Sequence, residues 1–281
     1  MMAGESGLVL IASFPKSGNT WVRLALASLM RGGAPLSFPA PVPDIPICAS
    51  RLRFDELMGV ESADLTPMEA YRLRPAMLRQ WAATPSEPRI LKVHDAWGRT
   101  PDGESLFPPE VIRAVVHVVR DPRDVCVSFA AHLDVSIETS ARYLSQGLWM
   151  ARGSRPVIQL PQWLPPWSEH VLSWAEDCPC PVLTIRFADM RADPRGTLAR
   201  IAHHIGLDSP ADALDRAVAA TTLEAMAAAE RRFGFVERQS KNNQFFGSGR
   251  VGGWRGVLSQ PLGDSIREAH AAAMTRVGLN E

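Results

Sequence analysis

The stretch that decides the fold is Ser13-Phe14-Pro15-Lys16-Ser17-Gly18-Asn19-Thr20-Trp21, which lies between an apolar run, Leu8 to Ala12, and an amphipathic stretch, Trp21 to Met30. The apolar run is typical of a strand buried on both faces, and the stretch after the loop has apolar residues at helical spacing. Between them, Gly18 lets the backbone turn its amides inward at a helix N-terminus, where the helix dipole favours anions. Together with the amine of Lys16, this pattern predicts a strand, a phosphate- or sulfate-binding loop and a helix.

The order of residues in this loop differs from that of the common nucleotide-binding loop. A Walker loop has Gly, four spacers and then Gly-Lys-Ser/Thr, so its lysine follows the second glycine. Here Lys16 precedes Gly18. The order Pro-Lys-Ser-Gly-Asn-Thr-Trp resembles the 5′-phosphosulfate loop of cytosolic-type sulfotransferases, which use 3′-phosphoadenosine 5′-phosphosulfate (PAPS). An ordinary glycine turn would explain Gly18 but not its neighbours. The resemblance implies that the donor is bound by Lys16, Ser17, Gly18, Asn19, Thr20 and Trp21.

The composition is that of an ordinary globular enzyme. Of the 281 residues, 46% are hydrophobic and 21% are charged, unlike a disordered or membrane chain. No apolar run approaches the roughly 18 residues of a membrane span, and residues 1–7 lack the basic start of a signal peptide. The 30 basic and 30 acidic residues cancel, so no overall field attracts nucleic acid or an anionic membrane. We expect a cytoplasmic protein with no nucleic-acid or membrane partner.

Length and cysteine content bound the organisation of the chain. We expect one domain over residues 1–281, with irregular cap or substrate segments near 32–88 and 133–174, and the sequence leaves a homodimer open. The chain has four cysteines, Cys48, Cys126, Cys178 and Cys180. Their spacing is not that of a zinc site, and nothing in the sequence indicates an oxidising compartment. We therefore expect no metal and no disulfide.

Three further apolar runs predict strands, at 89–94, 114–120 and 181–187. Helix-start signals follow two of them: Asp121-Pro122 begins a helix that runs through Ser128, and Asp193-Pro194 begins one that stops at Gly206. Alternating strands and helices predict an α/β fold with a central parallel β-sheet flanked by helices, whose ligand lies at the carboxyl ends of the strands. The resemblance makes this the P-loop-like sulfotransferase fold.

Lys92 and His94 project to the same face at the carboxyl end of the second predicted strand. On residue chemistry alone, a surface lysine and a packed histidine explain the pair as well. The order Lys-Val-His is similar to an element of the sulfotransferases in which the histidine is the general base on the acceptor hydroxyl. The resemblance implies this role for His94, assistance at the transferring group for Lys92, and stabilisation of the leaving phosphate for Lys16.

The third predicted strand ends in a segment, Arg120 to Ser128, that resembles the 3′-phosphate site of the same family. There the first arginine and the serine eight residues later hold the phosphate. A guanidinium suits phosphate, and a helix between the two residues would bring them within reach of each other. We expect Asp121 and Asp124 only to cap that helix, and Arg123 to be a solvated charge.

The resemblance is looser in the second half of the chain. The resemblance implies a nucleotide contact at Phe187, where the family usually has tyrosine, whose hydroxyl is missing here. It also implies contacts at Thr222 and Leu223, which with Thr221 fall where the family contacts adenine. Thr221 and Glu224 also fit a capping box, which explains this region equally well.

A glycine-rich segment, Phe246 to Arg255, resembles the last nucleotide-binding element of the family, with Gly247-Ser248 in place of an Arg-Lys pair. The resemblance implies nucleotide contacts at Ser248, Gly249 and Arg250, with either Arg250 or Arg255 supplying the charge that the lost pair would carry. The cap segment near 133–174 carries four tryptophans. They could form an aromatic wall over an acceptor pocket, or they could simply pack in the core, and the sequence favours neither explanation. They are Trp149, Trp163, Trp167 and Trp174, of which we expect Trp174 to pack a helix.

Taken together, the resemblance implies a PAPS-dependent sulfotransferase. Such an enzyme transfers a sulfuryl group to a hydroxyl of a small-molecule acceptor by in-line displacement and leaves adenosine 3′,5′-bisphosphate (PAP), without a metal. Residues 167–174 resemble those of bacterial sulfotransferases that tailor secondary metabolites, and this resemblance implies a bacterial enzyme of that kind. The alternatives are a P-loop-type nucleotide kinase or NTPase and a non-catalytic nucleotide-binding protein. The sequence does not disclose the acceptor.

Overall fold

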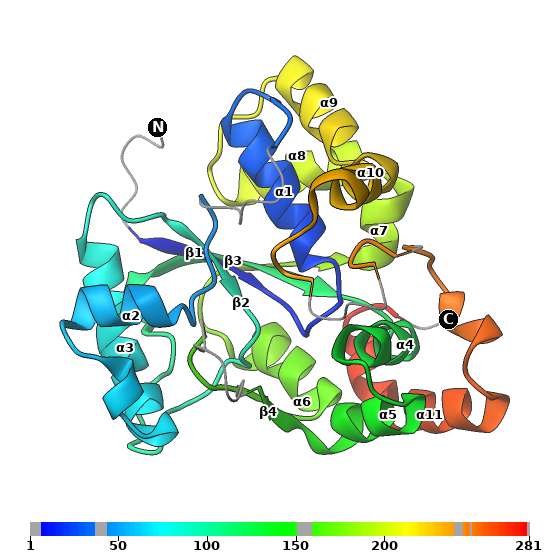
Figure 1. The fold of residues 1–281 in the computed structure, drawn as a ribbon, viewed down its shortest axis with the longest axis horizontal. Coiled ribbons are helices and arrows are strands. Elements are labelled where there is room, and N and C mark those ends of the chain that lie inside the picture. The colour runs from blue at the N-terminus through cyan, green and yellow to red at the C-terminus, as the bar shows by residue number, and fades with distance from the viewer. Residues whose placement is uncertain (1–6, 37–43, 151–158, 239–243, 248, 280–281) are drawn as a thin grey trace.

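The computed structural model describes residues 7–36, 44–150, 159–238, 244–247 and 249–279. Its centre is a four-stranded parallel sheet in the order β2-β1-β3-β6 (Figure 1). The strands are β1 (Leu8–Ala12), β2 (Ile90–Val93), β3 (Ile112–Val119) and β6 (Val182–Arg186). These are the four strands predicted from the sequence, and the predicted parallel sheet flanked by helices is confirmed.

Both faces of the sheet are covered, which explains why β1 is apolar throughout. Val9 and Ile11 belong to the core cluster that includes residues of α1 (Asn19–Met30) and α8 (Pro194–His204). Leu8 and Leu10 belong to a second cluster on the opposite face, together with Trp81 of α3 (Pro67–Ala83). This alternation follows the period of two of a strand. The helices predicted after the loop and after Asp193 are confirmed as α1 and α8.

The cap segments are more regular than expected. Among the described residues, 32–88 contain α3 and a further α-helix, and 133–174 contain two α-helices and an antiparallel pair of short strands, β4 (Leu148–Met150) and β5 (Gln162–Leu164). The capping box formed by Thr66 and Glu69 explains the start of α3. The remaining elements are α2 (Arg51–Met58), α4 (Pro122–Leu133), α5 (Ile137–Gln146), β4 (Leu148–Met150), β5 (Gln162–Leu164), α6 (Trp167–Leu172), α7 (Phe187–Ala192), α9 (Ala211–Ala220), α10 (Leu223–Phe233), α11 (Gln260–Arg276) and short helical turns at Ser62–Asp64, Pro109–Val111, Ser173–Asp177 and Gly253–Gly256.

The N-terminal caps of α4 and α10 test two of the predictions made from the sequence. Asp121 caps α4 by accepting from the Arg123 amide at 2.8 Å, with a proline at the first helical position, as predicted. The capping box expected at Thr221 and Glu224 is wrong. The N-cap of α10 is Thr222, whereas the Thr221 hydroxyl donates to the carbonyl oxygen of Ala217 at 2.7 Å.

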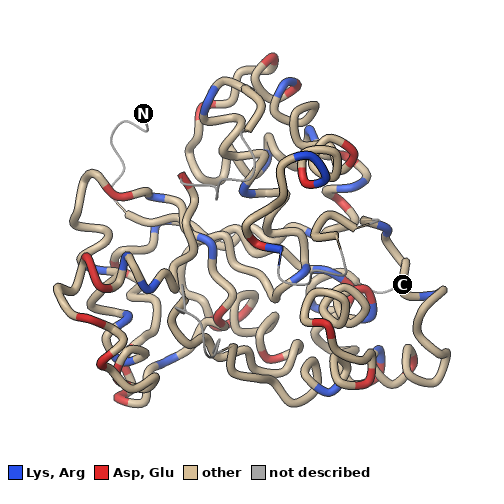
Figure 2. Tube along the Cα trace, in the orientation of Figure 1, with Lys and Arg blue, Asp and Glu red and all other residues tan. Residues whose placement is uncertain are grey.

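The 30 basic and 30 acidic residues of the sequence are not segregated, because charges of both signs are interspersed over the fold (Figure 2). Among the helices described here, none is long and apolar enough to cross a bilayer.

A buried ion pair holds the carboxyl end of β2. Arg74 of α3 and Asp95 are both almost fully buried, and the guanidinium donates to the carboxylate in a bidentate pair, with Nη1–Oδ1 at 2.7 Å and Nη2–Oδ2 at 2.8 Å. The indole of Trp174 also donates to the Asp95 carbonyl oxygen, at 3.1 Å. Because Asp95 follows His94 directly, these contacts fix the backbone that carries the histidine.

We expect R74M to destabilise the fold by about 3–5 kcal/mol, because it leaves the Asp95 carboxylate buried without its partner. Urea unfolding followed by circular dichroism measures the loss. The double variant R74M/D95L removes both charges and is expected to lose clearly less than R74M alone. Equal losses in the two variants would contradict this account of the pair.

Candidate active site

Three neighbouring parallel strands end at one edge of the sheet. β1 leads into the loop that carries Lys16, β2 ends just before His94, and β3 ends just before Arg120. All three side chains line one cleft of about 1800 Å³. The strand order β2-β1-β3 therefore brings together an amine, an imidazole and a guanidinium that are far apart in the sequence.

Gly18 shapes the loop at the start of α1. Its φ of 109° lies in the region that favours glycine, and a Cβ at this position would lie 2.8 Å from Met190 Cε and 2.9 Å from Phe187 Cδ2. The loop thus packs directly against α7. In the part of the chain described, no side chain caps α1, which leaves its N-terminal end suited to an anion.

The predicted donor-binding residues of the loop divide into two groups. Lys16, Gly18, Asn19, Thr20 and Trp21 line the cleft, whereas Ser17 is 1% exposed and is not among its lining residues. The Asn19 side chain holds the loop in place, because its amide donates to the Ile11 carbonyl oxygen at 2.9 Å. Ser17 Oγ has no hydrogen-bond partner among the described residues.

Lys16 carries a partly buried ammonium in this cleft. Its Nζ lies 4.0 Å from the ring centroid of Phe245, a cation–π contact. Burial, with the nearby charges of Lys92 and Arg120, lowers the pKa of Lys16 to about 8. The amine is therefore still mostly protonated at pH 7, and an anionic ligand would stabilise its charged form.

His94 has the tautomer that a general base needs. Its Nδ1 lies 2.9 Å from the carbonyl oxygen of Ser13, which can only accept, so Nδ1 carries the hydrogen and Nε2 has the free lone pair. Burial and the charge of Lys92 hold the pKa of His94 well below its ordinary value, so the ring is neutral at pH 7. His170 Nε2 donates to the His94 carbonyl oxygen at 3.0 Å and fixes the backbone behind it.

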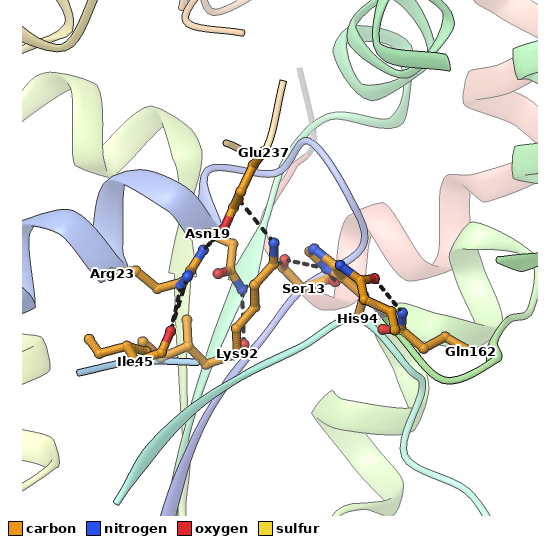
Figure 3. Close-up of polar contacts among 10 residues, drawn as sticks. Ser13, Asn19, Arg23, Ile45, Lys92, His94, Gln162 and Glu237 are labelled. Carbon is orange, nitrogen blue, oxygen red and sulfur yellow. Dashed lines mark hydrogen bonds and ion pairs between the residues drawn. The ribbon is translucent and has the colours of Figure 1, made fainter. Parts of the chain in front are cut away.

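Lys92 is bound to a carboxylate that the sequence did not single out. Its Nζ lies 3.1 Å from Oε2 of Glu237, whose Oε1 lies 2.6 Å from Nη1 of Arg23 (Figure 3). Glu237 follows α10 and is 145 residues away from Lys92. The only sequence signal was the position of Arg23 on α1, where this charged residue falls among buried apolar neighbours.

Arg120 contacts the backbone of the loop that carries Lys16. Its Nη1 donates to the Lys16 carbonyl oxygen and its Nη2 to the Arg250 carbonyl oxygen, both at 3.1 Å. The guanidinium carbon lies 4.2 Å from the ring centroid of Phe187. Phe187, which lacks the hydroxyl of the usual tyrosine, thus supports Arg120 with its ring face. Ser128, in the second turn of α4, lines the same cleft.

The expectations for Asp124 and Arg123 are wrong. The Asp124 carboxylate accepts from the backbone amides of Gly252 and Trp254, at 2.9 and 3.0 Å, and so anchors the glycine-rich segment to α4. Arg123 is 4% exposed and lies 4.3 Å over the ring of Trp254, so it is not a solvated charge. Spacing could not reveal these contacts, because they join α4 to a segment about 130 residues later.

The remaining predicted nucleotide contacts lie along the same wall. Thr222, Leu223, Gly249 and Arg250 line the cleft, and a Cβ at Gly249 would lie 2.8 Å from Leu223 Cδ2. Of the two candidate arginines, Arg250 lines the cleft, whereas the guanidinium of Arg255 lies 4.9 Å over the Trp254 ring. Ser248 lies outside the described residues.

The four tryptophans divide between core and cleft. Trp167 and Trp174 are completely buried, and Trp174 packs against Phe107 as part of the core. Trp149 is 45% exposed and lines the cleft, with its ring centroid 5.3 Å from that of Trp163. The pairing of β4 with β5 creates this aromatic pair.

Among the described residues, no cluster of three or more His, Cys, Asp or Glu side chains is placed to hold a metal ion. All four cysteines are free thiols.

Comparison with known proteins identifies the family. A family model described as "Sulfotransferase domain" matches residues 7–278. Cytosolic sulfotransferase 13 of Arabidopsis thaliana is 26% identical over 94% of this chain and 75% of its own length. Sulfotransferase 1A1 of Bos taurus is 26% identical over 78% of this chain and 65% of its own length.

Solved structures share the fold. Retinol dehydratase in complex with androsterone and inactive cofactor PAP superposes with a TM-score of 0.62 at 18% identity, covering 97% of this chain and 82% of that one. Mouse sulfotransferase SULT7A1 complexed with PAP gives 0.61 at 20% identity, covering 99% and 87%. Together with the match of the family model over nearly the whole length, these findings show that the chain belongs to the sulfotransferase family and is similar to its cytosolic members.

Proposed function

We propose that this enzyme transfers the sulfuryl group of PAPS to a hydroxyl of a small-molecule acceptor, with His94 as general base. The observation that carries the assignment is the convergence of Lys16, His94 and Arg120 from three adjacent strand ends on one cleft. A neutral base thus shares one cleft with two cationic groups suited to anions. The names of the relatives support a cytoplasmic location.

The residues present fit the donor. Lys16, Thr20 and the amide end of α1 would hold the 5′-phosphosulfate, because a lysine and free helix N–H groups favour an anion. Arg120 and Ser128 would hold the 3′-phosphate at the start of α4. The buried Ser17 Oγ, which has no hydrogen-bond partner among the described residues, would be a further hydrogen-bond donor in this loop. Thr222, Leu223 and Gly249 would contact the adenosine.

The chemistry at the acceptor is a proton transfer to His94. The acceptor oxygen forms a bond to sulfur while its proton passes to Nε2, the nitrogen left free by the hydrogen bond of Nδ1 to Ser13. The bond between sulfur and the 5′-phosphate oxygen breaks, and PAP leaves. Lys16 and Lys92 place positive charge where negative charge develops, and they contribute by electrostatic stabilisation.

The cap segments would bind the acceptor. Apolar side chains from α2 and from β4 line the cleft on this side, among them Leu52, Trp149 and Met150. Such a lining favours an uncharged alcohol or phenol with an apolar body. The fold neighbour retinol dehydratase, crystallised with androsterone and with retinol, supports this class.

The alternatives are not favoured. A nucleotide kinase or NTPase would use a carboxylate near the loop to hold magnesium. Here Asp121 is paired with Arg123 and Asp124 accepts two backbone amides, so both carboxylates already serve the protein. The free lone pair of His94 in the cleft argues for catalysis rather than binding alone.

We expect H94A to lower kcat by about 100- to 10,000-fold, the usual contribution of a general base. Its affinity for PAP should remain within about twofold of wild type, because the base contacts the acceptor rather than the nucleotide. Transfer of labelled sulfate to the best acceptor in a panel of alcohols and phenols measures the first quantity, and calorimetry the second. H203A, on the exposed face of α8, is the control. Unchanged turnover in H94A would refute the assignment.

We expect R120A to weaken PAP binding by about 10- to 100-fold, because a hydrogen bond to a charged group contributes about 1.5–3 kcal/mol. Calorimetric titration with PAP measures the change. The control is R195A, a surface arginine paired with Asp215, which should leave the affinity unchanged. Equal affinities of R120A and wild type would move the 3′-phosphate site elsewhere.

The lowered pKa of Lys16 predicts a pH dependence of donor-site binding. The ammonium is present below its pKa of about 8 and is lost as the pH rises through that value, so PAP affinity should fall between pH 7 and 9. K16R keeps its charge over this range and should show a flatter profile. Calorimetry at several pH values compares the two proteins. Parallel profiles would mean that another group controls binding.

A further inference from the structure

Glu237 lines the cleft and forms ion pairs with two cations that also line it. Each of its carboxylate oxygens binds a different cation: Oε1 lies 2.6 Å from Arg23 Nη1, and Oε2 lies 3.1 Å from Lys92 Nζ. Arg23 comes from α1, Lys92 from β2 and Glu237 from the segment after α10, so the bridge joins three separate parts of the fold (Figure 3). All three residues line the cleft.

One end of this bridge is fixed. The Arg23 side chain is 2% exposed, and its Nε and Nη2 both donate to the Ile45 carbonyl oxygen, at 3.2 and 3.0 Å. If an anionic ligand displaced Glu237, the guanidinium would remain buried without its carboxylate, which is strongly unfavourable. Glu237 is therefore expected to stay on Arg23 when the donor binds, and it can act as a fixed support.

The other end of the bridge is the group that needs support. Lys92 is 8% exposed, and burial lowers its pKa, while the charge of Glu237 acts in the opposite direction. Arg23, Lys16 and His94 are the other titratable groups that interact with it, and none of them supplies a negative charge. The carboxylate thus favours the protonated form of the amine and contacts it directly at the end of β2.

We propose that Glu237 is a positioning residue, anchored by Arg23, that holds the Lys92 ammonium charged and directed at the transferring group. This inference rests on the proposed function of Lys92. The proposal gives the segment after α10 a role in catalysis, although no sequence motif had indicated one.

The composition of the chain makes a direct test practical. Of the 30 basic residues only Lys16, Lys92 and Lys241 are lysines, and all others are arginines. Biosynthetic labelling with [13Cε]lysine therefore gives three signals in a carbon NMR spectrum, which K16R and K92M assign. In E237Q, without any ligand, the Lys92 pKa is expected to fall by about one pH unit, the size of a tenfold change in protonation.

R23Q/E237Q guards against a folding artefact, because it removes the anchor and the carboxylate together and leaves no unpaired buried guanidinium. The Lys92 pKa should fall in this variant as well. A Lys92 signal that titrates as in wild type in both variants would overturn the proposal, and this result does not depend on any enzymatic activity.

Kinetics test whether Glu237 acts through Lys92. E237Q should lower kcat for sulfate transfer from PAPS to 2-naphthol by about tenfold, yet change kcat by less than about twofold when introduced into K92M, since residues that act as a unit are not additive. The affinity for PAP, which lacks the sulfuryl group, should stay within about twofold. E230Q is the matched control: Glu230 accepts the amides of Phe245 and Phe246, so its effect should add to that of K92M.

The outcomes are distinguishable. Tighter PAP binding in E237Q would show that the carboxylate competes with the donor, and equal losses in the wild-type and K92M backgrounds would show a role independent of Lys92; either result overturns the proposal. If the wild-type protein transferred no sulfate to 2-naphthol or to any acceptor of the panel, the proposed function itself would fail, while the NMR titration would still decide whether Glu237 controls the Lys92 charge.

Discussion

Parallel pairing of β1 with both β2 and β3 is the constraint on which the rest of the structure depends. It requires the three strands to end at the same edge, where His94 and Arg120 directly follow β2 and β3 and the loop after β1 carries Lys16. Helices on both faces bury the sheet, so the only place for these groups to meet solvent and ligand is that edge. The arrangement explains why so much of the chemistry comes from residues next to strands.

Cations that lie together in a partly buried cleft repel one another and lose hydration. Nearby carboxylates offset this electrostatic cost. Lys92 and Arg23 share Glu237, and Arg120 lies near Asp124, whose oxygens also hold the glycine-rich segment. Asp95 plays the same part for Arg74 one residue beyond His94. These carboxylates maintain the charge and the direction of the cations that they contact.

The features that sequence reasoning predicted correctly are the local ones. The buried strand, the loop at Gly18 and the start of α4 at Asp121 all depend on neighbours within a few residues, and periodicity and capping preferences are strong there. Glu237 and the anchoring by Asp124 could not be found, because each depends on a contact across more than a hundred residues. The capping box at Thr221 failed by one residue, since two adjacent threonines offered the same local signal and tertiary packing chose between them.

The near-absence of lysine gives this fold an unusual chemical surface. Arginine supplies almost all of the positive charge, and its guanidinium does not react with ordinary amine reagents, whereas Lys16 has a pKa of about 8 and is partly deprotonated near neutral pH. Amine-selective reagents such as activated esters or aldehydes would therefore find few lysine side chains outside the cleft. An anionic aldehyde that docks on the loop could form an imine with Lys16, so the same residue distribution that serves anion binding also makes the site open to selective covalent labelling.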